Sequence, residues 1–416
     1  MVNHPAVTPF QRLLFKQLRR FIGPAPIRLR LGRGSSALCD GTGSECIVIS
    51  DSNALASMML DPEIGFGDAF MRGRVEIEGD LVHALEVIFL AMQTSSDRRW
   101  FDRLVSNWLH LVQTNTLGGS ASNIRHHYDL HTDFYKLWLD PQLVYTCAYF
   151  PTPSATLEEA QIAKLDYVCR KLQLQPGEKV VDAGCGWGAL ALHMAKYYGV
   201  TVQAYNISHE QIEHARARAL KEGLAGQVEF IEDDYRNIAG NFDVFVSVGM
   251  LEHVGREHYQ ELEEAVFRAI GDSGRGLIHF IGRNRPAHFS TWIRKRIFPG
   301  AYAPALREAV EIFENHEYSV FDVENLRQHY ALTLEHWLSR YERSADRVIE
   351  LFGAEFYRAW KLYLAGSVAS FRIGQLQLFQ VVFAGSTCPR ISWTRAHLYA
   401  EDSQVEEESR WSQPAF

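Results

Sequence analysis

The chain has 416 residues, of which 47% are hydrophobic and 22% charged. This composition excludes a disordered or fibrous protein, and the length favours two or three domains. No apolar run approaches the roughly 18–20 residues of a membrane-spanning helix, and the six cysteines lack the spacing of metal ligands. Because the N-terminus also lacks the pattern of a signal peptide, we expect a cytoplasmic protein.

Charge is distributed unevenly along the chain. Residues 1–39 contain seven Lys or Arg and no Asp or Glu, whereas acidic residues gather at 401–408 and the formal net charge is −8. A basic N-terminal segment on an acidic chain suits an anionic surface better than it suits general nucleic-acid binding. We therefore expect no nucleic-acid partner.

Residues 10–22 are predicted to form a basic amphipathic helix. Apolar side chains recur there at helical spacing and are interleaved with Arg and Lys. Such a helix can lie on a membrane surface, or it can dock on its own domain with its basic face in solvent. The sequence leaves both interpretations open.

Residues 40–118 mix two patterns, which predicts a small α+β domain. The strand-like patterns lie at 46–50 and 75–77, and the helical ones at 81–92 and 100–112. An uncharged segment rich in Gly, Ser, Thr and Asn follows and is typical of a linker. We divide the chain into an N-terminal domain at 1–113, a linker at 114–123, a catalytic domain at 124–393 and an acidic tail at 394–416.

From residue 156 onward, short apolar strands alternate with helical runs. Strands are predicted at 179–183, 200–205, 228–231, 242–248 and 276–281. Capping boxes at 156–159 and 208–211 predict where two of the helices begin. The alternation predicts an α/β fold with a doubly wound parallel sheet that has helices on both faces.

The first of these strands runs into a glycine loop. Asp182 is followed by Gly184, Gly186 and Gly188 in the pattern D-x-G-x-G-x-G. A helix start of this kind lets backbone N–H groups approach a ligand. The spacing is not the G-x-G-x-x-G of dinucleotide binders, and residues 185–209 contain no acid for the ribose of NAD. The loop is typical of S-adenosylmethionine methyltransferases; the alternative is a tight turn without a ligand.

Further segments carry a resemblance to a known family. They lie at 128–150 (beginning YDLHTDFY), 248–255 (VGMLEHVG), 278–282, 297–300 and 371–383. They resemble motifs of cyclopropane-fatty-acid synthases and mycolic acid cyclopropane synthases, and residues 64–81 resemble the N-terminal domain of the longer bacterial synthases. The resemblance implies a Rossmann-like class I S-adenosylmethionine methyltransferase domain with a smaller N-terminal α+β domain.

The resemblance also implies the reaction. Such enzymes add a methylene bridge from S-adenosylmethionine to the cis double bond of an unsaturated acyl chain, here within a membrane phospholipid. The carbocation that forms loses a proton to close the ring. Because the sulfonium would alkylate a strongly basic side chain, the family uses a bound bicarbonate as the base. Carried over residue by residue, the bicarbonate ligands are Cys147, Glu252, His279, the backbone of Ile281, and Tyr330.

For the cofactor, the resemblance and the glycine loop together imply a set of residues from five segments. The set is Tyr145, Thr146, Asp182, Gly184, Gly186, Gly188, Asn206, Gln211 and Asp234. Gln211 is expected to bind the ribose hydroxyls, and Asp234 to accept a hydrogen bond from the adenine amine. No metal is implied.

Residues 283–300 form a second basic stretch without acids, interleaved with aromatic and aliphatic side chains. By resemblance, this stretch is expected near the acyl entrance, where it would bind phospholipid head groups; a solvated basic loop is the alternative. The family further implies a homodimer, and we expect peripheral association with the inner membrane surface. Two other functions stay open: a C-methyltransferase that leaves a methyl or methylene branch, and a non-enzymatic lipid-binding protein.

Overall fold

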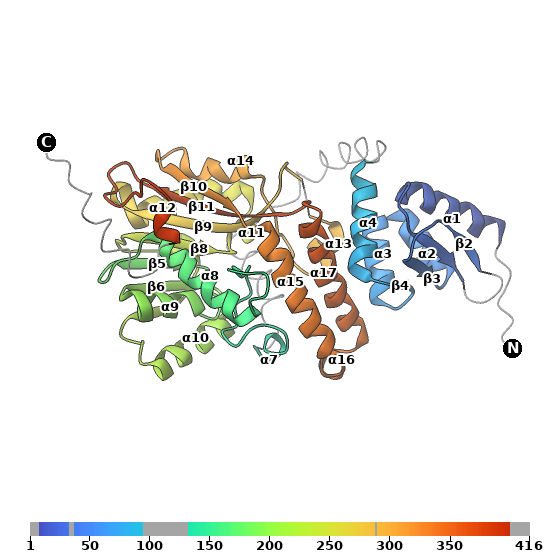
Figure 1. Cartoon of the computed structure of the whole chain (residues 1–416), viewed down its shortest axis with the longest axis horizontal. Coiled ribbons are helices and arrows are strands. Elements are labelled where there is room, and N and C mark those ends of the chain that lie inside the picture. The colour runs from blue at the N-terminus through green and yellow to red at the C-terminus, as the bar shows by residue number, and fades with distance from the viewer. Residues whose placement is uncertain (1–7, 33–36, 95–131, 288, 400–416) are drawn as a thin grey trace. The chain divides into compact units, whose positions relative to one another are not determined.

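The computed structural model describes residues 8–32, 37–94, 132–287 and 289–399 (Figure 1). It has two compact units, each assembled from separate stretches of the chain. The first unit combines residues 1–139, 281–305 and 327–378, and the second combines residues 140–280, 306–326 and 379–416. The predicted linker, the helix predicted at 100–112 and most of the predicted tail lie outside the described residues. The linear division into domains therefore stays a prediction.

The second unit is built on a seven-stranded sheet in the order β10-β11-β9-β8-β5-β6-β7 (Figure 1). The strands are β5 (Lys179–Ala183), β6 (Thr201–Asn206), β7 (Val228–Glu232), β8 (Val244–Val248), β9 (Arg275–Gly282), β10 (Ser319–Asn325) and β11 (Gln377–Ala384). Strands β5 to β9 pair in parallel, as predicted, whereas β10 and β11 pair antiparallel. The predicted doubly wound sheet is confirmed, with an antiparallel edge that the alternation did not predict.

Helices cover both faces of this sheet. One face carries α8 (Leu157–Leu172), α9 (Ala189–Tyr198) and α10 (His209–Glu222); the other carries α11 (Leu251–Val254), α12 (Tyr259–Ile270), α14 (Leu306–Ala309) and the 3₁₀ helix η4 (Val310–Phe313). The further 3₁₀ helices are η1 (Tyr235–Asn237), η2 (Arg256–His258), η3 (Gly271–Ser273) and η5 (Ala396–Leu398).

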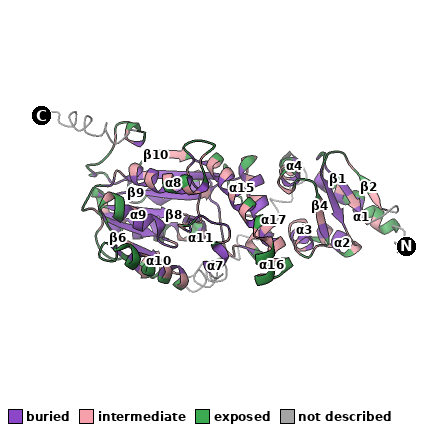
Figure 2. Ribbon diagram, turned by 60° about the horizontal axis from the view of Figure 1, so that its bottom comes forward, coloured by how far each residue is buried: buried purple, intermediate pink, exposed green. Residues whose placement is uncertain are grey.

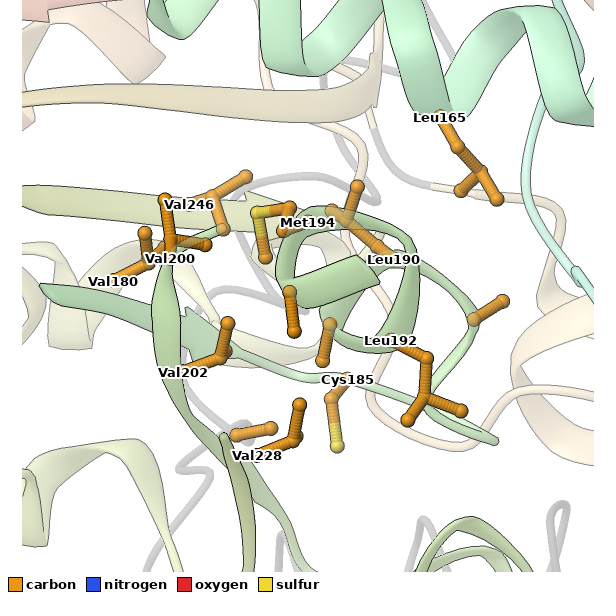
Figure 3. Close-up of a cluster of buried hydrophobic side chains, with 14 of the residues drawn as sticks. Leu165, Val180, Cys185, Leu190, Leu192, Met194, Val200, Val202, Val228 and Val246 are labelled. Atoms are coloured by element: carbon orange, nitrogen blue, oxygen red, sulfur yellow. The ribbon is translucent and has the colours of Figure 1, made fainter. Parts of the chain in front are cut away.

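Successive strand residues point to opposite faces, which gives the sheet two apolar cores. Val180 packs with Leu192 of α9 in one core, and its neighbour Val181 packs with Leu262 of α12 in the other. Figure 3 shows the first core, which also contains Cys185. The central strands β8 and β9 are buried along nearly their whole length (Figure 2).

The first unit contains a four-stranded sheet and most of the remaining helices. The sheet has the order β2-β1-β3-β4, with β1 (Arg28–Leu31), β2 (Leu38–Asp40), β3 (Cys46–Ile49) and β4 (Val75–Glu78). The helices are α1 (Pro9–Ile22), α2 (Ser52–Leu60), α3 (Pro62–Met71), α4 (Leu81–Thr94), α7 (Thr132–Tyr135), α13 (Thr291–Arg296), α15 (Arg327–Arg343), α16 (Ala345–Phe352) and α17 (Ala354–Arg372). In the part of the chain that the structure describes, no helix is long and apolar enough to cross a membrane.

Helix α17 explains why distant stretches of the chain form one unit. It packs against α3, α4 and α15. Arg358 of α17 donates to the carbonyls of Phe70 and Val75 at 2.6 and 2.9 Å, and its guanidinium lies 4.6 Å from the centre of the Phe70 ring. Residues 354–372 thereby pack directly on the N-terminal helices.

The predicted helix at 10–22 is present as α1, and Thr8 and Gln11 form a capping box at its N-terminus. Phe15 and Leu18 are buried in the first unit. Phe10 and Leu13, however, remain 66% and 54% exposed. The helix docks on its own unit and still presents apolar side chains to solvent, and its binding to a membrane surface stays a prediction.

The start of α10 differs from the prediction. The helix begins after Ser208, but Ser208 makes no capping hydrogen bond with its side chain. Instead, Oδ1 of Asn206 accepts from the N–H of Ile207 at 2.9 Å, and Oε1 of Gln211 accepts from Nδ2 of Asn206 at 2.6 Å. Because Gln211 is engaged with Asn206, the predicted capping box at 208–211 does not form.

Candidate functional site

The glycine loop joins the carboxyl end of β5 to α9. Gly184 and Gly188 have φ angles of +90° and +81°, which L-residues rarely adopt. A Cβ at Gly188 would lie 2.6 Å from the Phe230 ring, so this glycine is needed for packing. A Cβ at Gly186 would meet no atom within 4 Å. The loop is therefore open at Gly186, where a ligand can reach the backbone.

The loop lies at the point where the sheet changes direction. From β5 the chain continues outward to β6 and β7, whereas β8 returns to the opposite side of β5 and is followed by β9. Ligands of open α/β sheets bind outside the carboxyl ends of the strands at such a point. A Cβ at Gly184 would lie 3.0 Å from Cβ of Met250, so the turns that follow β5 and β8 are in contact.

The predicted residues Tyr145 and Thr146 reach the same point. Cγ2 of Thr146 lies 3.0 Å from where a Cβ at Gly249 would be, directly after β8. Tyr145 and Thr146 are both half-buried. The structure therefore brings the segment before α8 to the carboxyl end of β8.

Asp182 lies near the carboxyl end of β5 as a buried carboxyl group. It is 1% exposed, and no described residue donates a hydrogen bond to its Oδ2 atom. Burial raises the pKa of Asp182 to about 7, although the charge of Lys164 acts in the opposite direction. A buried carboxylate oxygen without a donor is costly, so the site suits a ligand that brings an N–H donor or a positive charge.

Asn206 and Gln211 are brought together with the glycine loop. Nδ2 of Asn206 donates to Gln211 and lies 3.4 Å from the carbonyl oxygen of Gly186. Gln211 is 4% exposed. The pair thus places two amide groups beside the open part of the loop.

Asp234 is engaged with Arg236. Oδ1 of Asp234 accepts from the backbone N–H and Nε of Arg236 at 3.0 and 2.8 Å, and Oδ2 accepts from Nη2 at 3.0 Å. A carboxylate can accept about four hydrogen bonds, so Oδ2 retains capacity for one more donor. The predicted adenine contact would have to use that remaining position.

Three of the predicted bicarbonate ligands are buried in the second unit. Cys147 is 0% exposed, Glu252 is 6% exposed in the first turn of α11, and His279 is 1% exposed on β9. The N–H of Gly249 donates to the His279 carbonyl at 2.8 Å, which ties the turn before α11 to β9. Glu252 and His279 therefore come from the carboxyl ends of neighbouring strands.

The side chain of Gln380 on β11 orients His279. Its Nε2 lies 3.0 Å from Nδ1 of His279. Burial lowers the pKa of His279 well below its ordinary value, so the ring is neutral. A neutral ring whose Nδ1 accepts from an amide carries its hydrogen on Nε2. His279 is consequently a hydrogen-bond donor through Nε2.

Ile281 and Tyr330 belong to the first unit. Ile281 is half-buried near the end of β9, and Tyr330 is buried in α15. The Tyr330 ring lies 4.6 Å from that of Phe371 and 6.0 Å from that of Trp337, centre to centre. Their roles as bicarbonate ligands stay predictions.

Two site residues were not identified from the sequence, Gln380 and Lys164. Each carried a signal: Gln380 is polar within the apolar strand β11, and Lys164 lies among the apolar residues of α8. Lys164 donates from Nζ to Oγ1 of Thr146 at 3.0 Å.

Part of the second basic stretch is used within the first unit. Arg296 of α13 pairs with Asp68 of α3 at 2.7 Å, and Nε1 of Trp292 donates to Asp68 at 3.2 Å. Trp292 is buried against Gly67, where a Cβ would lie 2.3 Å from the indole. Lys295, by contrast, is exposed. The stretch is therefore neither a fully solvated loop nor wholly available to lipid.

The chain is similar to known enzymes. Residues 116–381 match the family described as mycolic acid cyclopropane synthetase. The probable fatty acid methyltransferase of Pseudomonas putida is 32% identical over 388 residues, covering 90% of this chain and 96% of that protein. The cyclopropane-fatty-acyl-phospholipid synthase of Escherichia coli K12 is 32% identical over 355 residues, covering 85% and 91%.

A solved structure with the same fold is also similar. Mycolic acid cyclopropane synthase CmaA1, complexed with SAH and CTAB, is 31% identical with a TM-score of 0.61, covering 63% of this chain and 97% of that one. The likeness confirms the predicted Rossmann-like class I fold.

Proposed function

The chain belongs to the mycolic acid cyclopropane synthetase family, and from this membership we propose that it is an S-adenosylmethionine-dependent transferase that cyclopropanates unsaturated acyl chains. The observation that carries the proposal lies at the carboxyl end of β5. There the buried Oδ2 of Asp182, which no described residue engages, lies in the strand that leads to the open loop at Gly186. These groups fit a cofactor with an ammonium group and a ribose.

The residues that would hold the cofactor are those predicted. Asp182 would accept from the ammonium group, and Gln211 and Asn206 would bind the ribose hydroxyls beside Gly186. Tyr145, Thr146, Gly184, Gly188 and Asp234 complete the set. When bound, S-adenosylmethionine supplies an electrophilic methyl group.

The second part of the proposal concerns the proton that ring closure releases. Cys147, Glu252, His279, the backbone of Ile281 and Tyr330 would hold a bicarbonate ion, which supplies a base that resists alkylation. Neutral His279 donates through Nε2, a role that the Gln380 contact supports. Glu252 would accept from the hydroxyl of the ion and so orient it. Cys147, Glu252 and His279 are buried, and a buried site would keep water from the carbocation.

We further propose that the substrate is an intact phospholipid at an anionic membrane surface. The exposed Phe10 and Leu13 of α1 lie among the exposed basic residues Arg12 and Lys16, a combination typical of interfacial helices. Lys295 would add a basic contact. On this proposal the protein acts as a homodimer in the cytoplasm, peripherally bound to the inner membrane.

One alternative product is favoured by a specific observation. The relative from Pseudomonas putida, which is similar over 90% of this chain, is named a probable fatty acid methyltransferase. If the carbocation loses a different proton, or if a partner adds hydride, the product is a methylene- or methyl-branched chain.

The test incubates the pure protein with methyl-labelled S-adenosylmethionine and dioleoyl-phosphatidylglycerol vesicles. We expect the label in a cyclopropane methylene, whose protons resonate apart from vinyl and methyl protons. Label in a branch would establish the alternative, and acyl chains without label would overturn both proposals. Glu252→Gln is the matched control, because it should still bind S-adenosylhomocysteine while turnover falls about 10²–10⁴-fold.

The base is tested separately. Depleting dissolved carbon dioxide should slow the wild type, and added bicarbonate should restore its rate. Tyr330→Phe should need more bicarbonate for the same rate. A rate that does not respond to bicarbonate would mean that a side chain or water is the base.

A further inference from the structure

Lys164 is a buried amine to which the proposed chemistry assigns no task. It lies in the middle of α8 and is only 2% exposed. A buried charge is costly unless it is compensated. Burial lowers the pKa of Lys164 to about 8, and the carboxylates of Asp140 and Asp182 act in the opposite direction. The amine therefore lies near two carboxyl groups, and the direct contact that the structure gives it is the hydrogen bond to Thr146.

One face of α8 fixes the whole segment that contains Thr146. Nε2 of Gln161 donates to the carbonyls of Val144 and Thr146 at 3.3 and 2.9 Å. One turn further along the helix, Lys164 donates to the Thr146 side chain. The methyl group of Thr146 is placed beside Gly249. Both the backbone and the side chain of Thr146 are thus held in one orientation.

The contact with Lys164 also determines which way the Thr146 hydroxyl can donate. A lysine ammonium has three donors and no acceptor. The Thr146 oxygen must therefore accept from Lys164, and its own hydrogen has to point to a different acceptor. A hydroxyl donor backed by a buried positive charge is suited to an anionic group of a ligand.

The methionine part of S-adenosylmethionine is a zwitterion, and the site has matching groups. Asp182, at the end of β5, suits the ammonium. Thr146 and Lys164 lie by the turn after the neighbouring strand β8 and suit the carboxylate. We propose that Lys164 is a positioning residue that makes the Thr146 hydroxyl a donor to the carboxylate of the cofactor. This inference rests on the proposed function, because it takes S-adenosylmethionine as the ligand.

The test measures calorimetric affinity for two probes that differ in the relevant group. S-adenosylhomocysteine has the carboxylate, whereas 5′-methylthioadenosine lacks the amino-acid part. Lys164→Met should weaken binding of S-adenosylhomocysteine about tenfold or more and leave binding of methylthioadenosine within about twofold. Thr146→Val should give the same selective loss, the double variant should add little to it, and Thr146→Ser should retain affinity.

Lys171→Met is the matched control. Lys171 is also buried on α8, but its Nζ pairs with Glu324 at 2.6 Å. It should lose stability without changing the ratio of the two affinities. This control separates a general effect of removing a buried lysine from a specific effect on the carboxylate.

The possible failures are distinguishable. A wild type that binds neither probe would overturn the proposed function itself. A wild type that binds S-adenosylhomocysteine, with a Lys164→Met variant that loses affinity for both probes equally, would overturn this inference alone. If Lys164→Met does not fold, Thr146→Val decides, because unchanged affinity for S-adenosylhomocysteine in that variant contradicts the assigned role.

Discussion

His279 and Gln380 illustrate how a single contact sets the chemistry of a side chain. Burial keeps the imidazole neutral, and the amide nitrogen of Gln380 donates a hydrogen bond to Nδ1. The hydrogen on Nε2 is therefore a consequence of a residue on another strand. Replacing the donor at position 380 by an acceptor should therefore move the ring hydrogen from Nε2 to Nδ1.

We expect Gln380→Glu to impair turnover more than Gln380→Leu does. A carboxylate at position 380 would accept from Nδ1–H, so Nε2 would become an acceptor, whereas leucine merely removes the contact. Turnover should fall about 100-fold or more in the glutamate variant, with S-adenosylhomocysteine affinity retained in both. Steady-state rates together with calorimetry provide the measurement. Equal rates in the glutamate variant and the wild type would contradict a donor role for His279.

The buried carboxyl of Asp182 should make stability depend on pH. Its pKa in the folded protein is about 7, against an ordinary 3.8. A raised pKa means that the folded state binds the proton more tightly, so this stabilisation is complete below about pH 4 and is lost as pH rises through 7. The free energy of unfolding of the wild type should therefore fall, relative to Asp182→Asn, between these values. Urea unfolding without ligand at pH 4, 5.5 and 7 provides the measurement, and parallel curves would contradict the assignment.

At the scale of elements, α8 and α10 begin with the same sequence pattern but different contacts. The Thr156 side chain accepts from the N–H of Glu159, and Glu159 reaches back to the N–H of Thr156. At α10, Asn206 and Gln211 form a pair instead, and Ser208 caps nothing with its side chain. The cap of α8 is structural, whereas the residues at the start of α10 are directed toward the glycine loop.

Alanine substitutions should distinguish the two helix starts. Thr156→Ala should lower the free energy of unfolding by about 1 kcal/mol, the usual worth of a formed cap. Ser208→Ala should change it by less than about 0.5 kcal/mol. Chemical denaturation of both variants is the check, and a loss at Ser208 as large as that at Thr156 would contradict the difference between the two caps.

Local sequence patterns predicted some elements of this structure and missed others. Strands β5 to β9 were predictable because buried parallel strands are short apolar runs. Strands β1, β2 and β10 were not, since they are short or carry exposed polar residues. The glycine loop was evident from local spacing, but the contact of Lys164 with Thr146 spans 18 positions and that of Gln380 with His279 spans 101. Such pairs depend on the fold, which spacing in one sequence does not reveal.

At the scale of the molecule, membrane binding can be tested with substitutions that leave the core intact. Deleting α1 would remove the buried Phe15 and Leu18, so it cannot separate binding from folding. Changing the exposed Phe10 and Leu13 to serine should instead lower partitioning onto anionic vesicles about tenfold or more, since each buried apolar side chain contributes about 1.5–3 kcal/mol. Co-sedimentation at low and high salt measures this effect.

Substitutions in α13 test the electrostatic part of membrane binding. Lys295→Glu should weaken binding to anionic vesicles, and the loss should shrink at high salt. Arg296→Glu breaks the pair with Asp68 and should also lower stability, whereas the exchange Asp68→Arg with Arg296→Asp should recover it. Salt-independent binding that is equal on anionic and zwitterionic vesicles would contradict the electrostatic part of the proposal.

The order of strands in the large sheet has a consequence for folding during synthesis. Strand β11 (Gln377–Ala384) lies between β9 and β10, so β10 has no neighbour in this sheet until residues near 384 have been made. The first unit is likewise incomplete until α17 has been made. Neither unit can be completed on a ribosome before almost the whole chain has emerged. A nascent chain arrested before residue 377 should therefore expose an unpaired edge at β9, a surface that is prone to aggregation and that chaperones should bind.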